Sequence, residues 1–128
     1  MTGRNNTIVL GDRVVINASK QQPTYINACE GTHITIGDYC LFSNNIEIHT
    51  TDYHKIFKDN ERTNLPSNVS IGNHCWIGLR CIILKGSVIP DNSVIGCCSL
   101  VNKKFTENNS MIAGVPAKVI SHDISWNH

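Results

Sequence analysis

Residues 71–101 read IGNHCWIGLRCIILKGSVIPDNSVIGCCSLV, and a six-residue rhythm runs through the whole stretch. Counting in steps of six from Ile71, every position up to Val101 is Ile or Val. Four residues after each of the first five of these positions the side chain is small, namely in Cys75, Cys81, Ser87, Ser93 and Ser99. An α-helix repeats every 3.6 residues and a half-buried strand every two, so neither accounts for a period of six.

A period of six indicates a short strand followed by a corner, repeated around a coil. The aliphatic and the small residue of each hexad then point inward, and three hexads, or about 18 residues, close one triangular coil. The rhythm also appears upstream at Ile36, Phe42 and Ile48, and turn-forming aliphatic-Gly-Asp phrases begin at Leu10 and Ile36. We predict an all-β triangular solenoid, a parallel β-helix forming one domain over residues 1–128. A sandwich of short strands is the alternative, but it has no reason to keep one phase.

The rhythm breaks once, between the upstream hexads and Ile71. A coil that starts at Ile36 should be followed by one that starts at position 54, but the next regular hexad begins 17 residues later. The intervening residues 54–70, HKIFKDNERTNLPSNVS, are polar and charged, and they predict a protruding loop. Long loops in compact folds are usually functional, although a tolerated insertion is the alternative.

The composition excludes several classes of protein. Eleven Lys and Arg against ten Asp and Glu give a net charge of +1, without the basic excess of a nucleic-acid-binding protein. No apolar run approaches the ~18 residues of a membrane span, and we recognise no secretory signal, so we expect a soluble, cytoplasmic protein.

The six cysteines form no CxxC pair, which argues against a structural zinc site. Cys40, Cys75 and Cys81 fall in the small inward column, and we interpret them as core residues. Cys97 and Cys98 lie outside that column, and one of them remains a candidate reactive thiol.

The hexads of residues 71–101, the phrase GNHCWIG at 72–78 and the phrase GVPAKVI at 114–120 resemble the hexapeptide-repeat acyltransferases. Within that family the chain looks like the sugar and polysaccharide O-acetyltransferases of the galactoside, maltose and capsule type, over about residues 8–120. The resemblance implies a left-handed parallel β-helix, acetyl-CoA as co-substrate without a metal, and a hydroxyl of a sugar or saccharide as acceptor. It also implies a homotrimer with active sites between subunits. The N-terminal helical segment of the galactoside and maltose enzymes is missing, so its acceptor contacts are not carried over.

His54 is the candidate general base, because it stands where the coil breaks into the loop, in the stretch HTTDYH at 49–54. An imidazole can take the proton of a hydroxyl near neutral pH, and the family's base has a similar Thr-x-x-His context. His49 is the rival base. Asp52, two residues before His54, is predicted either to orient the His54 ring or to serve only as a turn carboxylate.

The resemblance places part of the acetyl-CoA site around the tryptophan phrase. Trp76 precedes the inward Ile77, so strand alternation points its side chain outward, where it lines the cleft or contacts another subunit. A backbone N–H near Gly78 and Leu79 serves the oxyanion in the family. Gly96 is expected to let the pantetheine arm approach the backbone closely.

The remaining cofactor contacts are expected nearer the C-terminus. Lys103 and Lys118 resemble lysines that lie near the CoA phosphates in the family, with ordinary solvated lysines as the alternative. Gly114 and Ala117 belong to a segment, residues 105–128, that is expected to cover the cofactor.

Other positions and other functions stay open. The positions before the later inward residues are apolar, which indicates an oligomer: Ile82, Val88, Val94 and Leu100. One rival function is a zinc enzyme like the gamma-class carbonic anhydrases, using His49, His54 and either His33 or His74. The others are an N-acetyltransferase acting on an amino sugar and a non-catalytic scaffold that binds no CoA.

Overall fold

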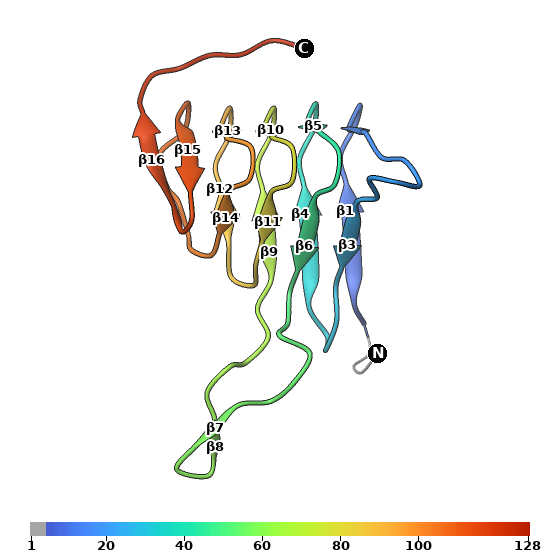
Figure 1. Ribbon diagram of the computed structural model, residues 1–128, viewed down its shortest axis with the longest axis vertical. Coiled ribbons are helices and arrows are strands. Elements are labelled where there is room, and N and C mark those ends of the chain that lie inside the picture. The colour runs from blue at the N-terminus through green and yellow to red at the C-terminus, as the bar shows by residue number, and fades with distance from the viewer. Residues whose placement is uncertain (1–4) are drawn as a thin grey trace.

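The computed structural model describes residues 5–128, which form sixteen strands and no helix. Most strands are two to four residues long, and they assemble into three parallel faces. The chain visits the first, second and third face in that order four times, and Figure 1 shows the resulting coils stacked side by side. The described residues therefore form a parallel β-helix.

Each face contains one strand from every coil. The first face is β1 (Thr7–Leu10), β4 (His33–Ile36), β9 (Val69–Ile71) and β12 (Val88–Ile89). The second face contains β2 (Val15–Ile16), β5 (Leu41–Phe42), β10 (Trp76–Ile77), β13 (Val94–Ile95), β15 (Met111–Gly114) and β16 (Ala117–Ser121). The third face is β3 (Tyr25–Asn27), β6 (Glu47–His49), β11 (Ile82–Ile83) and β14 (Leu100–Val101).

The inward positions predicted from the hexads form the core. From Ile36 onward they are almost completely buried: Ile36, Phe42, Ile48, Ile71, Ile77, Ile83, Ile89, Ile95 and Val101. The small column is buried as well, including Cys40, Cys75 and Cys81, which confirms them as core residues. Burying an aliphatic side chain of this size contributes about 1.5–3 kcal/mol, so this column is the main source of stability.

The corner between the first and second faces explains the recurring aliphatic-Gly-Asp/Asn phrase. The side-chain oxygen of Asp38 accepts the backbone N–H of Asp12 in the preceding coil at 2.8 Å. Asn73 does the same for the N–H of Asp38, and Asp91 for the N–H of Asn73, each at 2.8 Å. The side chains therefore form a hydrogen-bonded ladder along the corner.

The glycine of each phrase makes room for this ladder. A Cβ built on Gly11, Gly37 or Gly72 would lie 2.3 Å from the ladder oxygen of the next coil, closer than real atoms come. A side chain at any of these positions would force neighbouring coils apart.

The chain between β6 and β9 leaves the stack. It contains β7 (Phe57–Lys58) and β8 (Glu61–Arg62), which pair antiparallel, and Figure 1 shows this hairpin extending away from the coils. The expected loop boundary at residue 70 is wrong by two residues. Val69 and Ser70 already belong to β9, because Val69 is buried in the core and pairs with Ile34.

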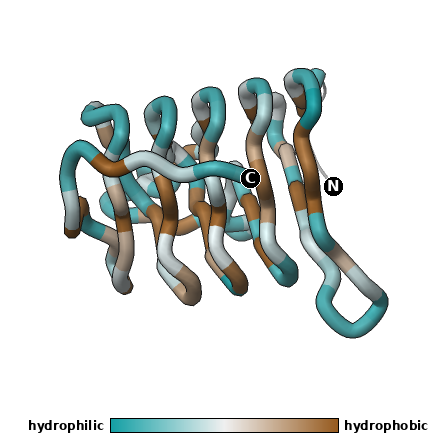
Figure 2. The backbone as a smooth tube through the Cα atoms, turned by 90° about the horizontal axis from the view of Figure 1, so that it is seen from above, coloured by the Kyte–Doolittle hydropathy of each residue, from teal (hydrophilic) through white to brown (hydrophobic). Residues whose placement is uncertain are grey.

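The second face is extended at its end by β15 and β16. Strand β15 pairs parallel with β13, and β16 folds back antiparallel to β15. The residues after β16 then run back across the stacked coils (Figures 1 and 2). Since residues 5–128 form no helix, they contain no helical segment that could cross a membrane.

We predict that Gly37→Ala destabilises the protein. Its Cβ would lie 2.3 Å from Asn73 Oδ1 and 2.7 Å from the carbonyl carbon of Gly72, and overpacking of this kind costs about 1–3 kcal/mol. The melting temperature should fall well below that of Thr35→Ala, a matched control whose side chain is exposed on the same strand, β4. Equal melting temperatures for the two variants would contradict this explanation of the glycine.

Candidate active site

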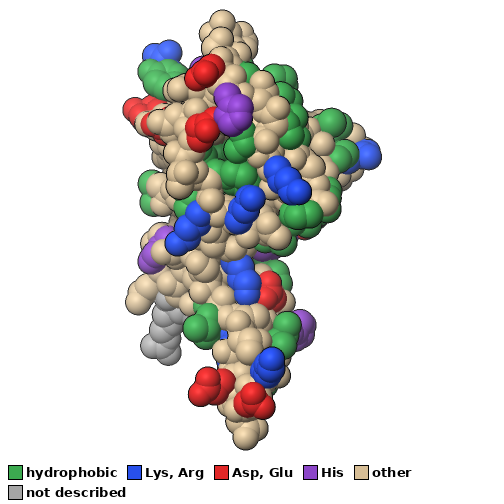
Figure 3. Space-filling view, turned by 90° about the vertical axis from the view of Figure 1, so that its left-hand side faces the viewer, with side chains coloured by type: hydrophobic (Ala, Val, Ile, Leu, Met, Phe, Trp, Pro, Cys, Tyr) green, Lys and Arg blue, Asp and Glu red, His purple; other side chains and the backbone are tan. Residues whose placement is uncertain are grey.

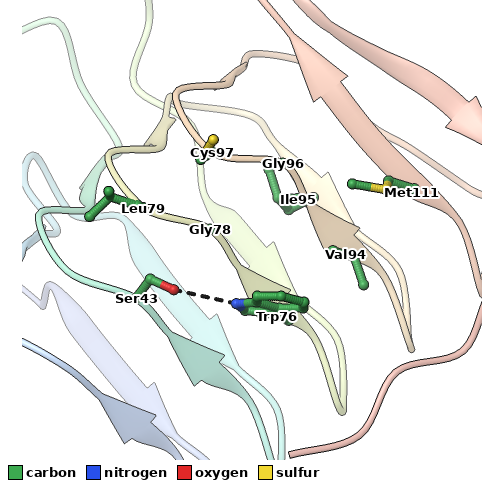
Figure 4. A pocket seen from close by; sticks show the side chains of 9 residues that line it. All are labelled: Ser43, Trp76, Gly78, Leu79, Val94, Ile95, Gly96, Cys97 and Met111. Carbon is green, nitrogen blue, oxygen red and sulfur yellow. Dashed lines mark hydrogen bonds between the residues drawn. The ribbon is translucent and has the colours of Figure 1, made fainter.

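An apolar groove of about 310 Å³ lies on the second face (Figure 4). Its lining comes from β10, β13 and β15 and from the residues that follow β5, β10 and β13: Ser43, Trp76, Gly78, Leu79, Val94, Ile95, Gly96, Cys97 and Met111. Strand register places Trp76, Val94 and Met111 in one row, each preceding an inward isoleucine, so this row points outward. The groove is therefore a product of the same alternation that builds the core.

Trp76 forms the wall of this groove. Its Nε1–H donates to Ser43 Oγ at 3.3 Å, and 38% of the residue is exposed. The sequence predicted that Val94 is exposed to solvent in a monomer. It is only 7% exposed, because Trp76 and Met111 flank it in the same row. The outward Trp76 is confirmed, and this outer strip is already partly covered within one chain.

The backbone donors beside Trp76 are not equivalent. The N–H of Gly78 is bonded to the carbonyl of Ile95 at 2.9 Å, so it serves coil stacking. The N–H of Leu79 forms no hydrogen bond with any residue that the structure describes. Leu79 is thus the better candidate of the two for holding an oxyanion.

Gly96 lines the groove, but its close packing has another cause. A Cβ on Gly96 would lie 2.9 Å from the Cβ of Ala113 on β15. The neighbouring strand therefore requires this glycine, whatever binds in the groove.

Of the four residues expected near the cofactor toward the C-terminus, three are exposed on the surface and one is buried in the core. Lys118 is exposed on β16, and Lys103 lies with its Nζ 5.1 Å from the centre of the Phe105 ring. Figure 3 shows Lys and Arg side chains gathered on the side of the molecule where the stack ends. Gly114 is exposed and donates its N–H to Ser99 Oγ at 3.1 Å. Ala117 is 1% exposed and packs in the core, so its side chain does not reach a ligand.

His54 lies at the base of the hairpin. Its side chain is exposed, and its imidazole has no hydrogen-bond partner among the described residues. Its carbonyl accepts a hydrogen bond from Nδ2 of the buried Asn64 at 2.8 Å. The Oδ1 of Asn64 accepts the N–H of Ile56 at 2.7 Å, so one side chain ties both strands of the hairpin together.

Asp52 is held by groups other than the His54 ring. Its Oδ2 accepts hydrogen bonds from Lys85 Nζ at 2.7 Å and from Asn64 Nδ2 at 3.0 Å. The Lys85 ammonium, followed by the Asn64 amide, lowers the pKa of Asp52. This ion pair stabilises the folded state above the unfolded-state pKa of about 3.9, and its contribution is lost as the pH falls through the lowered, folded-state pKa.

A second ion pair anchors the far strand of the hairpin. Both guanidinium NH₂ groups of Arg62 reach Glu30, at 3.1 and 3.2 Å, and Thr51 Oγ1 donates to the same carboxylate. These hydrogen bonds, those from Arg62 first, lower the pKa of Glu30. Sequence reasoning missed Glu30, Arg62, Asn64 and Lys85, because none of them carries a motif. Lys85 lies in a turn of the regular hexads, and the period does not show its partner.

His49, the rival base, has both ring nitrogens engaged. Nε2 lies 2.9 Å from Glu47 Oε1 and Nδ1 lies 2.5 Å from the Tyr53 hydroxyl. The other histidines considered for zinc are also paired, His33 with Thr7 and His74 with Asn92. Within residues 5–128 no group of three or more His, Cys, Asp or Glu side chains is placed to hold a metal ion.

The structure does not bring His54 and Trp76 together in one chain. His54 follows β6 and lies on the path from the third face to the first. The groove lies on the second face and the turns that leave it, and neither His54 nor Asp52 lines it. The candidate base, His54, and the groove thus lie on different parts of the triangle.

Lys85→Met should raise the pKa of Asp52 toward its ordinary value of about 3.9, because the charge that favours the carboxylate is removed. NMR titration of the Asp52 carboxyl carbon measures this change. Lys103→Met, which removes a lysine lying over an aromatic ring, is the matched control and should leave that pKa unaltered. An identical Asp52 titration in wild type and Lys85→Met would refute the role given to the ion pair.

Comparison with known proteins finds O-acetyltransferases among the sequence relatives of this chain, and no family model matches the chain. The galactoside O-acetyltransferase of Escherichia coli (strain K12) is 40% identical over 90 residues, 68% of this chain and 43% of that protein. The polysialic acid O-acetyltransferase of Neisseria meningitidis is 42% identical over 103 residues, 79% of this chain and 48% of that protein. The chain spans less than half the length of these curated relatives.

A solved structure shares the fold. The hexapeptide-repeat-containing acetyltransferase VCA0836 of Vibrio cholerae O1 biovar eltor, complexed with acetyl-coenzyme A, superposes with a TM-score of 0.74 at 24% identity. The match covers 91% of this chain and 63% of that one. In sequence the chain is similar to these O-acetyltransferases, and its hexad-built coils have the fold of a hexapeptide-repeat acetyltransferase, as the resemblance implied.

Proposed function

We propose that this chain is the β-helix of an acetyl-CoA-dependent O-acetyltransferase that acetylates a hydroxyl of a sugar or polysaccharide precursor. The observation that carries the proposal is the apolar groove beside Trp76, with the unbonded N–H of Leu79 at its edge. The names of the two sequence relatives support an O-acetyl transfer to a saccharide. The acetyl-CoA complex of the Vibrio cholerae relative supports the donor.

The groove suits the pantetheine end of acetyl-CoA. Its lining is mostly apolar, which fits a thioester and a largely hydrocarbon arm better than it fits a phosphate. Lys103 and Lys118 are exposed near the end of the stack, where ammonium groups would attract the phosphates of the nucleotide end.

The reaction proposed is a direct transfer. The imidazole of His54 removes the hydroxyl proton of the acceptor as its oxygen attacks the thioester carbonyl. The N–H of Leu79 holds the oxyanion of the tetrahedral intermediate. The C–S bond then breaks, and the imidazolium returns its proton to the CoA thiolate. Asp52 acts in this scheme by anchoring the hairpin through Lys85 and Asn64, not by contacting the ring.

Because base and groove occupy different corners, the proposal requires a second copy of the chain, as in the homotrimer expected from the family. The hairpin supports this arrangement. Ile56, Phe57 and Leu65 on and beside it are 57%, 61% and 64% exposed, unusual for large apolar side chains in a soluble protein. Docked against a neighbouring copy, these side chains would be buried and His54 would be carried toward that copy's groove.

His54→Ala should reduce acetyl transfer to a saccharide acceptor by about 10²–10⁴-fold, because the hydroxyl loses its base. Acetyl-CoA binding, measured by calorimetry, should change little, because His54 is not part of the groove. His33→Ala, which removes a histidine bonded to Thr7, is the control and should retain turnover. Near wild-type turnover by His54→Ala would refute the assignment. A wild-type protein that binds no acetyl-CoA would favour a scaffold, and transfer confined to amino sugars would make it an N-acetyltransferase.

Phe57→Ser should weaken self-association, because it removes the ring that the hairpin offers to a neighbouring copy. Sedimentation over a range of concentrations should show dissociation at about tenfold higher protein concentration than for the wild type, the factor expected for losing roughly 1.4 kcal/mol of contact. Lys58→Ser, on the same strand and also exposed, should sediment like the wild type. If Phe57→Ser assembles as tightly as the wild type, the hairpin is not the contact.

A further inference from the structure

The residues after β16 form an extended strap along the corner between the first and second faces. The N–H of Ile124 donates to the carbonyl of Asn109 at 2.9 Å. Trp126 Nε1–H donates to the carbonyl of His74 at 2.8 Å, and His128 Nε2 lies 3.0 Å from the carbonyl of Tyr39. Figures 1 and 2 both show this stretch crossing the coils.

These contacts follow the stack of coils and pass over the equivalent corner at Asn92. The three accepting residues occupy the same left-handed corner position in different coils, with φ between 53° and 60°. From Asn109 to Tyr39 there are three coil steps of about 4.8 Å each, or roughly 14 Å. The four residue-to-residue steps from Ile124 to His128, fully extended, also span about 14 Å. Every second residue of the strap therefore meets a corner carbonyl, which makes it a docked segment rather than a loose tail.

Trp126 is the buried residue of the strap. It is only 8% exposed and stacks flat on the His74 ring, with centroids 4.2 Å apart and planes 8° from parallel. His74 Nδ1 donates to Asn92 Oδ1 at 3.0 Å, which fixes the plane of the imidazole and so the plane of the indole above it. The strap thus holds the Trp126 side chain in a defined orientation.

Besides His74 and His128, the Trp126 ring packs against Trp76, the wall of the groove. The ring centroids of Trp126 and Trp76 are 5.9 Å apart with a tilt of 41°, within the range of favourable aromatic pairs. Among the described residues, the Trp76 indole makes one side-chain hydrogen bond, to Ser43. Without Trp126, the indole would keep this hydrogen bond and lose its aromatic neighbour.

We propose that Trp126 is a positioning residue, which fixes the Trp76 indole as the wall of the acetyl-CoA groove. The part that concerns acetyl-CoA rests on the proposed function. The part that concerns Trp76 does not, because it can be measured without any ligand.

The test uses the fact that the chain contains two tryptophans, so that a Trp126 variant leaves Trp76 as the sole indole. Trp126→Phe keeps an aromatic ring over His74, and Trp126→Leu fills the space without one. Ser125→Ala, at the neighbouring exposed strap position, is the matched control. Melting curves establish that each variant is folded, and acrylamide quenching then reports the exposure of Trp76.

We expect Trp76 to be markedly more quenchable in Trp126→Leu than in Trp126→Phe. Acetyl-CoA should bind to Trp126→Leu about tenfold more weakly than to the wild type, to Trp126→Phe within about threefold, and to Ser125→Ala unchanged. Equal quenching and equal affinity in Trp126→Leu and Trp126→Phe would overturn the proposal.

A second measurement does not depend on whether Trp126→Leu folds. Two indoles at this distance and tilt should give an exciton-coupled circular dichroism band in the wild type, which Trp126→Phe abolishes. A band unchanged in Trp126→Phe would refute the contact itself. If the wild type binds no acetyl-CoA, the proposed function fails, while the quenching and dichroism results still decide whether Trp126 positions Trp76.

Discussion

Backbone hydrogen bonds between parallel strands fix the distance between successive coils near 4.8 Å, and most features of this molecule follow from that distance. Any residue that faces the neighbouring coil must fit within it. At the first corner this excludes a Cβ on Gly11, Gly37 and Gly72, because the Asp or Asn of the next coil already places its oxygen there. The same oxygen satisfies an N–H of the coil before it, so the corner is packed and hydrogen-bonded at once.

Stacking also creates the candidate site, because each inward isoleucine of the second face has an outward neighbour in register. Trp76, Val94 and Met111 form an outward row because the strand register that aligns the inward isoleucines also aligns the residues that precede them. The strap also depends on the stacked coils, since its backbone and side chains form hydrogen bonds with corner carbonyls of three different coils. Trp76, the wall of the groove, is thus positioned by the pairing of its strand with neighbouring coils and by the ring of Trp126.

The hairpin is not held by the repeat. It is fastened instead by polar contacts from distant segments, with Lys85 on Asp52, Glu30 on Arg62, and Asn64 bridging its base. These contacts are directional and charged, so they set the position of His54 without a hydrophobic core. They do so at the corner away from the groove, which is why one chain holds the two halves of the proposed chemistry apart.

Because a period of six leaves a regular signal at every turn, the coil, its inward residues and the outward direction of Trp76 could be predicted from the sequence. It also singled out His54, since the break in the period lies beside it. The sequence did not show that Asp52 pairs with Lys85, that Ala117 belongs to the core, or that Trp126 lies against Trp76. These contacts depend on which residues the fold brings together, and no regular spacing in the sequence marks them. A repeat predicts the positions that recur in every coil. An individual side-chain contact occurs once, so it is known only after the chain has folded and brought the two residues together.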